Sequence, residues 1–214
     1  MPRDAKKMRR RLQEAALKLF QRQGYEQTTA ADIAAEAEVT QRTFFRHFSD
    51  KREVLFGGEE VFIETLTKAI LNASPDLGPR DVLLHAFRSA EPLFIENRSF
   101  SAPRQVIIAS HPALQERAQT KIRAVIAALA TALRQRGVPE RLANLAAQVG
   151  MAALNDGVAA WFQSGSNDLR PHVEQAFRDV RDLASGALDT PPRSKSGAVR
   201  KGRATRRKTK SAVL

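Results

Sequence analysis

Hydrophobic residues in this chain recur at intervals of three and four positions, which is the spacing of side chains along one face of an α-helix. The first such segment begins near Lys6 and ends at Gly24, a residue suited to the left-handed C-terminal cap of a helix. Its apolar positions are Met8, Leu12, Ala15, Ala16, Leu19 and Phe20. The pattern therefore predicts an amphipathic first helix.

Two shorter helical segments follow, on either side of a tight turn. Thr29 and Asp32 form a Thr-x-x-Asp start for the first, Glu38 and Val39 make the turn, and Thr40 caps the second. The expected buried side chains are Ile33, Ala34 and Ala37 in the first segment, and Phe44, Phe45 and Phe48 supply the apolar contacts of the second. This is the layout of a helix-turn-helix, so the sequence predicts binding to duplex DNA through the second short helix.

Asp50 and Glu53 resemble a capping box for a further helix, which we expect to continue to Ile70 and to be weakened or bent by Gly57 and Gly58. Residues 72–80, NASPDLGPR, are rich in helix breakers and mark a domain boundary. The expected division is a helix-turn-helix domain at 1–57 with the fourth helix linking on to about 73, a helical ligand-binding and dimerisation domain at 74–189, and a basic tail at 190–214.

The second half of the chain keeps the helical period. The predicted helices are 81–96, 103–109, 112–136, 139–163 and 168–188. No stretch alternates with the period of two that a half-buried strand requires. The expected fold class is therefore all-α, with no sheet.

The positive charge is concentrated toward the two ends of the chain. Of the formal net charge of +12, nine Lys and Arg residues and no acid lie after Asp189, which leaves +3 for the preceding residues. Such a distribution suits a polyanion better than an acidic small substrate. The tail has too few large apolar groups to offset chain entropy, so we expect it to be disordered.

The absence of cysteine excludes disulfides, thiolate metal sites and cysteine redox chemistry. No apolar run approaches the roughly 18 residues that a membrane-spanning helix requires, and polar residues break any signal-peptide core. The sequence therefore predicts a cytoplasmic protein with no membrane partner.

The Thr-capped second helix, the Asp-Ile-Ala segment at 32–34, the Thr-Phe-Phe-Arg-His-Phe run at 43–48 and Lys51 together resemble the TetR/AcrR family of bacterial transcriptional regulators. The resemblance covers about the first 57 residues. It implies an all-helical homodimer whose N-terminal domain binds a DNA operator and whose C-terminal domain binds a small-molecule effector. Glu38 stands where the family usually has Gly, and a left-handed Glu would be strained by about 1 kcal/mol.

The resemblance places Gln41, Arg42 and Thr43 in the first turn of the helix that enters the major groove. The Arg42 guanidinium can bond guanine in bidentate fashion, Gln41 favours adenine, and the Thr43 methyl group can contact thymine. Phe45 takes the place of a family Tyr and would make only apolar or stacking contact. Thr29, Arg46, His47 and Lys51 are expected to contact phosphates. The complete set of candidate DNA-contacting residues is Thr29, Thr40, Gln41, Arg42, Thr43, Phe45, Arg46, His47 and Lys51.

The basic run from Lys6 to Arg11 is open to two interpretations: an arm that reaches the flanking DNA backbone or minor groove, or a solubilising start. For the effector pocket the candidates are His85, Phe87, Phe94, Ile107, Leu129, Leu154, Asn155 and Trp161, each of which could equally be plain core. The apolar stripes expected to pair across the homodimer comprise Leu142, Leu145, Val149, Val173, Phe177, Val180 and Leu188. A two-fold dimer would set the recognition helices about 34 Å apart and predicts a palindromic operator.

An enzyme is the first alternative class. We find no metal-ligand cluster, no glycine-rich phosphate loop and no nucleophile elbow, so we expect no catalytic residues, no metal and no cofactor. A non-specific DNA-binding architectural protein that uses the basic tail is the second alternative. It predicts binding that ignores base sequence, whereas a regulator, most simply a repressor released by its effector, must discriminate among sequences.

Overall fold

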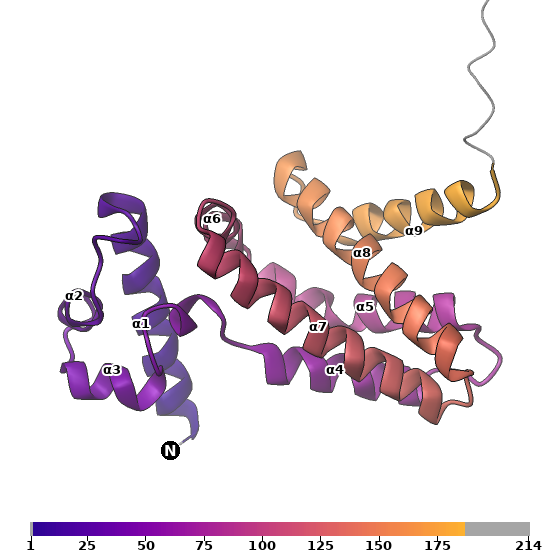
Figure 1. Cartoon of the computed structure of the whole chain (residues 1–214), viewed down its shortest axis with the longest axis horizontal. Coiled ribbons are helices and arrows are strands. Elements are labelled where there is room, and N and C mark those ends of the chain that lie inside the picture. The colour runs from indigo at the N-terminus through magenta and orange to yellow at the C-terminus, as the bar shows by residue number, and fades with distance from the viewer. Residues whose placement is uncertain (1, 187–214) are drawn as a thin grey trace, which may run out of the picture.

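The computed structural model of the chain describes residues 2–186, which form nine α-helices and one 3-10 helix without any strand (Figure 1). The elements are α1 (Pro2–Gln23), α2 (Ala30–Glu36), α3 (Gln41–His47), η1 (Glu53–Leu55), α4 (Glu59–Asn72), α5 (Pro79–Glu96), α6 (Arg98–Ala109), α7 (Pro112–Gln135), α8 (Glu140–Ser164) and α9 (Arg170–Ala184). The predicted all-α class is confirmed for this part of the chain. None of the described helices is long and apolar enough to span a membrane. The tail that we expected to be disordered lies outside the described residues.

The helices α1, α2, α3 and η1 enclose one hydrophobic core. Leu12, Ala16 and Phe20 of α1 pack in it with Ile33 of α2 and Phe44 of α3, and all five are buried. In Figure 1 these helices form the lobe at the left of the view. The apolar stripe of the first predicted helix is therefore the face of α1 against which α2 and α3 pack.

The helix caps that the sequence predicted in this lobe are present. Gly24 ends α1 in the left-handed region with φ of 89°. The Thr29 hydroxyl accepts the backbone N–H of Asp32 at 3.1 Å, and the Asp32 carboxylate accepts the N–H of Thr29 at 2.9 Å, which completes a capping box. Thr40 caps α3 by accepting the N–H of Thr43 at 3.2 Å. Each such cap is worth about 1 kcal/mol.

Glu38 occupies the tight turn between α2 and α3 in the left-handed conformation, with φ of 51°. This is the strain expected for a residue other than glycine at that place. The Arg11 guanidinium donates to the Glu38 carboxylate at 2.5 Å, but both side chains are exposed, so the pair offsets little of the strain.

The predicted continuous helix from Asp50 to Ile70 is wrong, because the chain breaks before α4. The Asp50 carboxylate accepts the N–H groups of Arg52 at 2.7 Å and Glu53 at 3.2 Å, but the turn that it starts, η1, ends after three residues. Gly58 then adopts φ of 88°, a left-handed conformation that cannot continue an α-helix, and α4 begins at the next residue. The glycines interrupt the helix outright rather than bending it.

A second hydrophobic core lies among α4, α5, α7, α8 and α9. Leu66 and Ile70 of α4 pack there with Phe87 of α5, Leu129 of α7 and Trp161 of α8. These helices form the right-hand part of Figure 1. The helix α6 begins five residues earlier than predicted, at Arg98, and includes Pro103 in its interior.

The helix α7 reaches both cores. Leu114, near its start, is buried in the first core, whereas Val125 and Leu129 are buried in the second. Between these positions, the Arg117 guanidinium binds the Glu53 carboxylate of η1 through two contacts of 2.6 and 3.0 Å. The two lobes are therefore joined by packing and by an ion pair as well as by the chain at Gly58.

Candidate nucleic-acid interface

The short helix α3 has one buried side and one exposed side. Phe44 and Phe48 point into the first core and fix the rotation of the helix about its axis. Gln41 and Arg42 are consequently exposed, and Phe45 is 50% exposed although it is a large apolar side chain. The first turn of α3 therefore exposes Gln41 and Arg42, two of the three side chains that the sequence proposed as base readers.

Arg42 and Arg46 lie one turn apart on α3 and both are exposed. Within residues 2–186 neither guanidinium has a hydrogen bond or an ion pair. A guanidinium that is already held by a carboxylate must break that pair before it binds a phosphate or a guanine. These two side chains do not have that cost, and they supply unneutralised positive charge on this side of α3.

The threonine hydroxyls near α2 and α3 are engaged in local hydrogen bonds. Thr29 donates its hydroxyl hydrogen to the Asp32 carboxylate at 2.8 Å, and the Thr40 and Thr43 hydroxyls lie 3.0 Å apart. The bonds from Thr29, first the backbone N–H and then the hydroxyl, lower the pKa of the Asp32 carboxyl group. Thr29 and Thr40 thus hold the helix starts in place, and Thr43 is half-buried beside its cap.

His47, which the sequence proposed as a phosphate ligand, is half-buried at the end of α3. Its Nε2 atom is buried and has no hydrogen-bond partner among the described residues. Burial, together with the nearby charges of Arg46 and Arg9, lowers the pKa of the imidazole. The ring is therefore neutral at pH 7, and the structure gives it no charge with which to attract a phosphate.

Lys51 differs most from its expected role as a phosphate contact. Its ammonium group donates to the backbone carbonyls of Tyr25 at 2.9 Å, Glu26 at 3.3 Å and Thr28 at 3.1 Å, and lies 4.4 Å from the centre of the Tyr25 ring. The three ammonium protons thus have three acceptors. Lys51 ties the loop between α1 and α2 to the segment that follows α3, a role that the sequence analysis missed.

Arg9 is a second residue whose role the sequence did not reveal. Its guanidinium donates to the His47 carbonyl at 3.0 Å and lies 4.3 Å from the centre of the Phe48 ring. Arg9 and His47 are 38 residues apart in the sequence, so no local pattern predicts this hydrogen bond. Arg9 anchors the start of α1 to the C-terminal end of α3.

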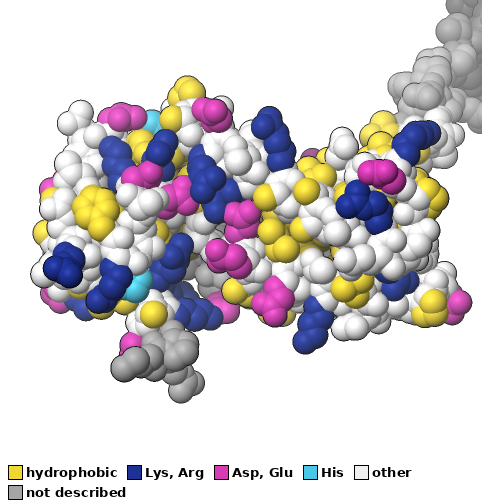
Figure 2. Space-filling model, turned by 60° about the horizontal axis from the view of Figure 1, so that its bottom comes forward, with side chains coloured by type: hydrophobic (Ala, Val, Ile, Leu, Met, Phe, Trp, Pro, Cys, Tyr) yellow, Lys and Arg dark blue, Asp and Glu magenta, His cyan; other side chains and the backbone are white. Residues whose placement is uncertain are grey.

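The surface in Figure 2 differs between the two lobes. Lys and Arg side chains, with Asp and Glu among them, are spread over the N-terminal helices at the left of the view, and a broader hydrophobic area lies over the C-terminal helices at the right. The unpaired cations Arg42 and Arg46 on the exposed side of α3 suit a DNA backbone. The hydrophobic area suits a protein partner better than a nucleic acid.

The structure does not bring the eight candidate effector residues together around a hollow. Phe87, Leu129, Leu154 and Trp161 are packed in the second core, while Ile107 is buried in the first. His85 and Asn155 are exposed and Phe94 is half-buried against the second core. For the four residues in the second core, the plain core interpretation describes what the structure shows.

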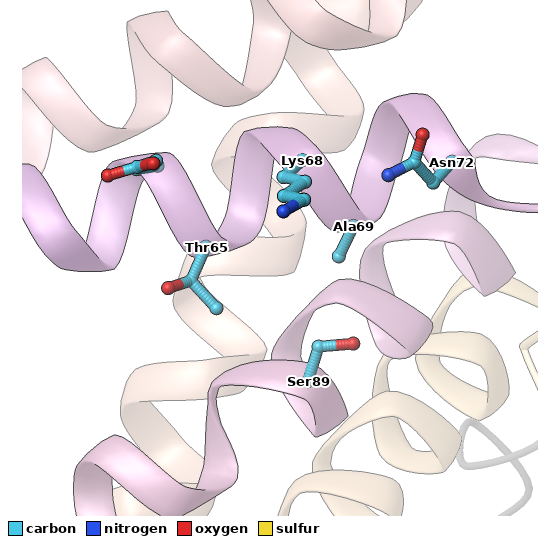
Figure 3. A pocket seen from close by; sticks show the side chains of 6 residues that line it. Thr65, Lys68, Ala69, Asn72 and Ser89 are labelled. Carbon is cyan, nitrogen blue, oxygen red and sulfur yellow. The ribbon is translucent and has the colours of Figure 1, made fainter.

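Two surface hollows are formed by other residues. The larger, of about 390 Å³, lies between α4 and α5 and is lined by Glu64, Thr65, Lys68, Ala69, Asn72 and Ser89. Figure 3 shows Thr65 and Ala69 on the side of α4 that faces Ser89 of α5. The smaller, of about 160 Å³, lies between α1 and the junction of α5 with α6. Neither is lined by any of the eight candidate effector residues.

The family model for bacterial regulatory proteins of the tetR family matches residues 12–56, the segment from α1 to the end of η1. The HTH-type transcriptional regulator TcmR of Streptomyces glaucescens is 38% identical over 87 residues, which is 41% of this chain. The helix-turn-helix segment of this chain is therefore that of the TetR family. The match to TcmR spans only 38% of the length of that relative.

Solved structures of TetR-family proteins share the fold beyond the matched segment. A protein from Syntrophomonas wolfei superposes with a TM-score of 0.61 at 20% identity, covering 87% of this chain and 99% of its own. The regulator FadR from Bacillus subtilis, solved in complex with stearoyl-CoA, gives a TM-score of 0.58 at 19% identity, covering 82% and 97%. At these identities the likeness establishes the TetR fold and not a shared ligand.

Proposed function

We propose that this TetR-family chain is a sequence-specific transcriptional regulator that binds a palindromic operator and is released from it by a small molecule. The observation that carries the proposal is the exposed side of α3, where Gln41, Arg42 and Arg46 are held in fixed positions by buried Phe44 and Phe48. A short helix that is capped by Thr40 and packed through Phe44 holds the backbone of the base readers rigidly.

The base readers are Gln41, Arg42 and Thr43 in the first turn of α3. Arg42 is the strongest of them, because a free guanidinium can bond the O6 and N7 atoms of guanine in bidentate fashion. Gln41 can bond adenine in the same manner, and the Thr43 methyl group can meet thymine. Phe45, half-exposed on the same helix, supplies an apolar contact to the DNA.

The helix starts and Arg46 position the protein on the backbone. Thr29 and Thr40 stand at the N-termini of α2 and α3, where backbone N–H groups favour an anion. Arg46 adds a full positive charge one turn after Arg42. Phosphate contacts of this kind fix register and carry no base preference. In this proposal His47 and Lys51 act indirectly, by holding the structure that presents the other residues.

A two-fold dimer through α8 and α9 accounts for apolar side chains that the single chain leaves exposed. Leu142, Leu145 and Val149 of α8 are 46%, 49% and 36% exposed, and Leu183 of α9 is 64% exposed. An apolar stripe of this size on paired helices suits a self-complementary helical bundle. Val173 and Phe177, which we had also assigned to the dimer, are buried within the chain, Val180 is half-buried, and Leu188 lies outside the described residues.

In this proposal DNA binding lies in residues 1–57, and effector binding and dimerisation lie in residues 74–189. The helix α4 between them is buried in the second core through Leu66 and Ile70. FadR from Bacillus subtilis, a protein of the same fold, was solved with stearoyl-CoA, which supports a small-molecule effector. An effector that favours another arrangement of the lobes would weaken operator binding by a coupling of about 1–3 kcal/mol.

The test is selection of bound duplexes from a random pool, followed by binding measurements on the selected duplex and its single-base variants. Arg42→Ala should reduce affinity by about 1–3 kcal/mol and abolish discrimination at one base pair in each half-site. Arg123→Ala, at an exposed position of α7, is the matched control and should behave as the wild type.

Two results would contradict the proposal. The first is a wild-type protein that binds all duplexes equally, which is what the architectural alternative predicts. The second is an Arg42→Ala variant that keeps the base preference of the wild type, because the residue would then not read the operator.

A further inference from the structure

The basic run at the start of the chain is part of the helix α1. Lys6, Lys7, Arg9, Arg10 and Arg11 all lie within its first three turns. A helix about 10 Å wide does not enter the minor groove, which is about 6 Å wide, as an extended arm can. The interpretation of this run as a minor-groove arm is therefore excluded by its conformation, and its charges must act from the surface of a helix.

Two of the arginines in this run are already neutralised. The Arg10 guanidinium binds the Glu14 carboxylate at 3.0 Å, and Arg11 binds the Glu38 carboxylate at 2.5 Å. The two lysines, by contrast, are exposed, and no described residue forms an ion pair with either of them. Asp4, in the first turn of α1, is an exposed acid close in sequence to these lysines. The lysines are thus free cations that the fold itself does not use.

The start of α1 lies beside the C-terminal end of α3. Arg9 makes this contact through the His47 carbonyl and the Phe48 ring. Figure 1 shows the first turns of α1 at the lower edge of the left-hand lobe, where they extend past the end of α3. Lys6 precedes Arg9 by three residues and so lies on the same face of α1, one turn nearer the N-terminus.

We propose that Lys6 and Lys7 bind phosphates of the DNA backbone beside the groove that receives α3. This rests on the proposed function, in which the first turn of α3 reads bases. The opposite end of α3, with Arg46, then faces the backbone that borders the groove, and the first turns of α1 extend this end by two further cations. A lysine ammonium binds phosphate as a point charge, so the contact adds affinity and no base preference.

The test compares the full-length wild type with the Lys6→Gln/Lys7→Gln variant on the selected duplex and on a scrambled duplex, over a series of salt concentrations. Glutamine preserves helix propensity and removes only the charge. Each phosphate contact contributes about 0.9 to the slope of log K against log salt, so loss of two contacts lowers the slope by about 2 per bound protomer. The loss should be equal on both duplexes, and the preference for the selected sequence should not change.

Two further variants act as controls. Lys68→Gln removes an exposed lysine from α4, in the other lobe, and should leave the slope unchanged. Asp4→Asn removes the neighbouring acid and should raise the affinity for both duplexes. Circular dichroism and the thermal midpoint of each variant confirm that α1 still forms. The basic residues after Asp189 are present in every variant and cancel in the comparison.

The inference is overturned if the double variant has the salt slope of Lys68→Gln, or if it loses discrimination at a base pair with no change of slope. Its failure can be told from failure of the proposed function. A wild type that selects an operator while the lysine variant keeps its slope refutes only the lysine contacts. A wild type with no sequence preference refutes the regulator, whatever the slope of the lysine variant.

Discussion

Substitution of Lys51 by methionine tests whether this residue holds the fold or binds DNA. Methionine keeps much of the side-chain volume and removes the ammonium group. In the structure that group donates to the carbonyls of Tyr25, Glu26 and Thr28 at 2.9 to 3.3 Å and lies 4.4 Å from the centre of the Tyr25 ring. The substitution removes all four interactions. The carbonyls of Glu26 and Thr28 lose the ammonium donor, whereas that of Tyr25 still accepts the N–H of Thr28 at 3.3 Å.

A hydrogen bond from a charged group contributes about 1.5–3 kcal/mol when it is buried. The three carbonyls are only partly shielded, so water replaces part of what each loses. We therefore expect Lys51→Met to lower the free energy of unfolding by about 2–3 kcal/mol in total. For a protein of this size the thermal midpoint should fall by about 4–12 °C.

The assay is urea unfolding followed by circular dichroism, together with operator binding over a salt series below the unfolding transition. Lys68→Met, at an exposed lysine of α4, is the control and should change neither measurement. A phosphate role for Lys51 makes the opposite prediction: unchanged stability, and a salt slope lowered by about 0.9 per bound protomer. That outcome would show that the bonds to the three carbonyls do not stabilise the fold.

Two smaller predictions follow from single residues of the first lobe and its link. Gly58→Ala should lower the free energy of unfolding by about 1–2 kcal/mol, because Gly58 has φ of 88°. The control is Gly78→Ala, which should not lower it, because Gly78 has φ of −71° and open space around it. Equal effects of the two substitutions in urea unfolding would refute the strain argument. The pKa of His47 is lowered from 6.5 in the folded state, so the unfolded state takes up the proton more readily and stability should fall as pH drops below about 6.5. His47→Gln should flatten this pH dependence of the free energy of unfolding, and an unchanged profile would exclude His47 as its source.

The sequence predicted best the features whose partners are close in the chain. Thr29 and Asp32 are three residues apart, as are Thr40 and Thr43, so each cap is visible as a short pattern. Gly24 follows the last apolar position of its helix. The break at Gly58 was missed because a glycine in a helical pattern is compatible either with a weakened helix or with a left-handed residue that ends it. Only the neighbouring structure decides between the two.

The residues that line a surface hollow could not be predicted from the sequence for a related reason. Phe87, Leu129 and Trp161 lie on helical stripes that packing alone requires, and they fill the second core. The larger hollow is lined instead by polar residues such as Thr65 and Ser89, which a search for apolar stripes passes over. A stripe shows which side of a helix is buried, and says nothing of whether protein atoms or a ligand cover it.

Cations pose the hardest problem for sequence reasoning about DNA contacts, because a free and an engaged cation look the same in a sequence. Arg42 and Lys51 both lie in the helix-turn-helix region, yet Arg42 is free among the described residues while Lys51 is bound to carbonyls 23 to 26 residues away. The partners of Lys51 are backbone carbonyls, so no acidic residue in the sequence indicates that Lys51 is engaged. A count of Lys and Arg residues therefore overstates the number of phosphate contacts. Only the cations that the fold leaves unpaired are available to bind phosphate.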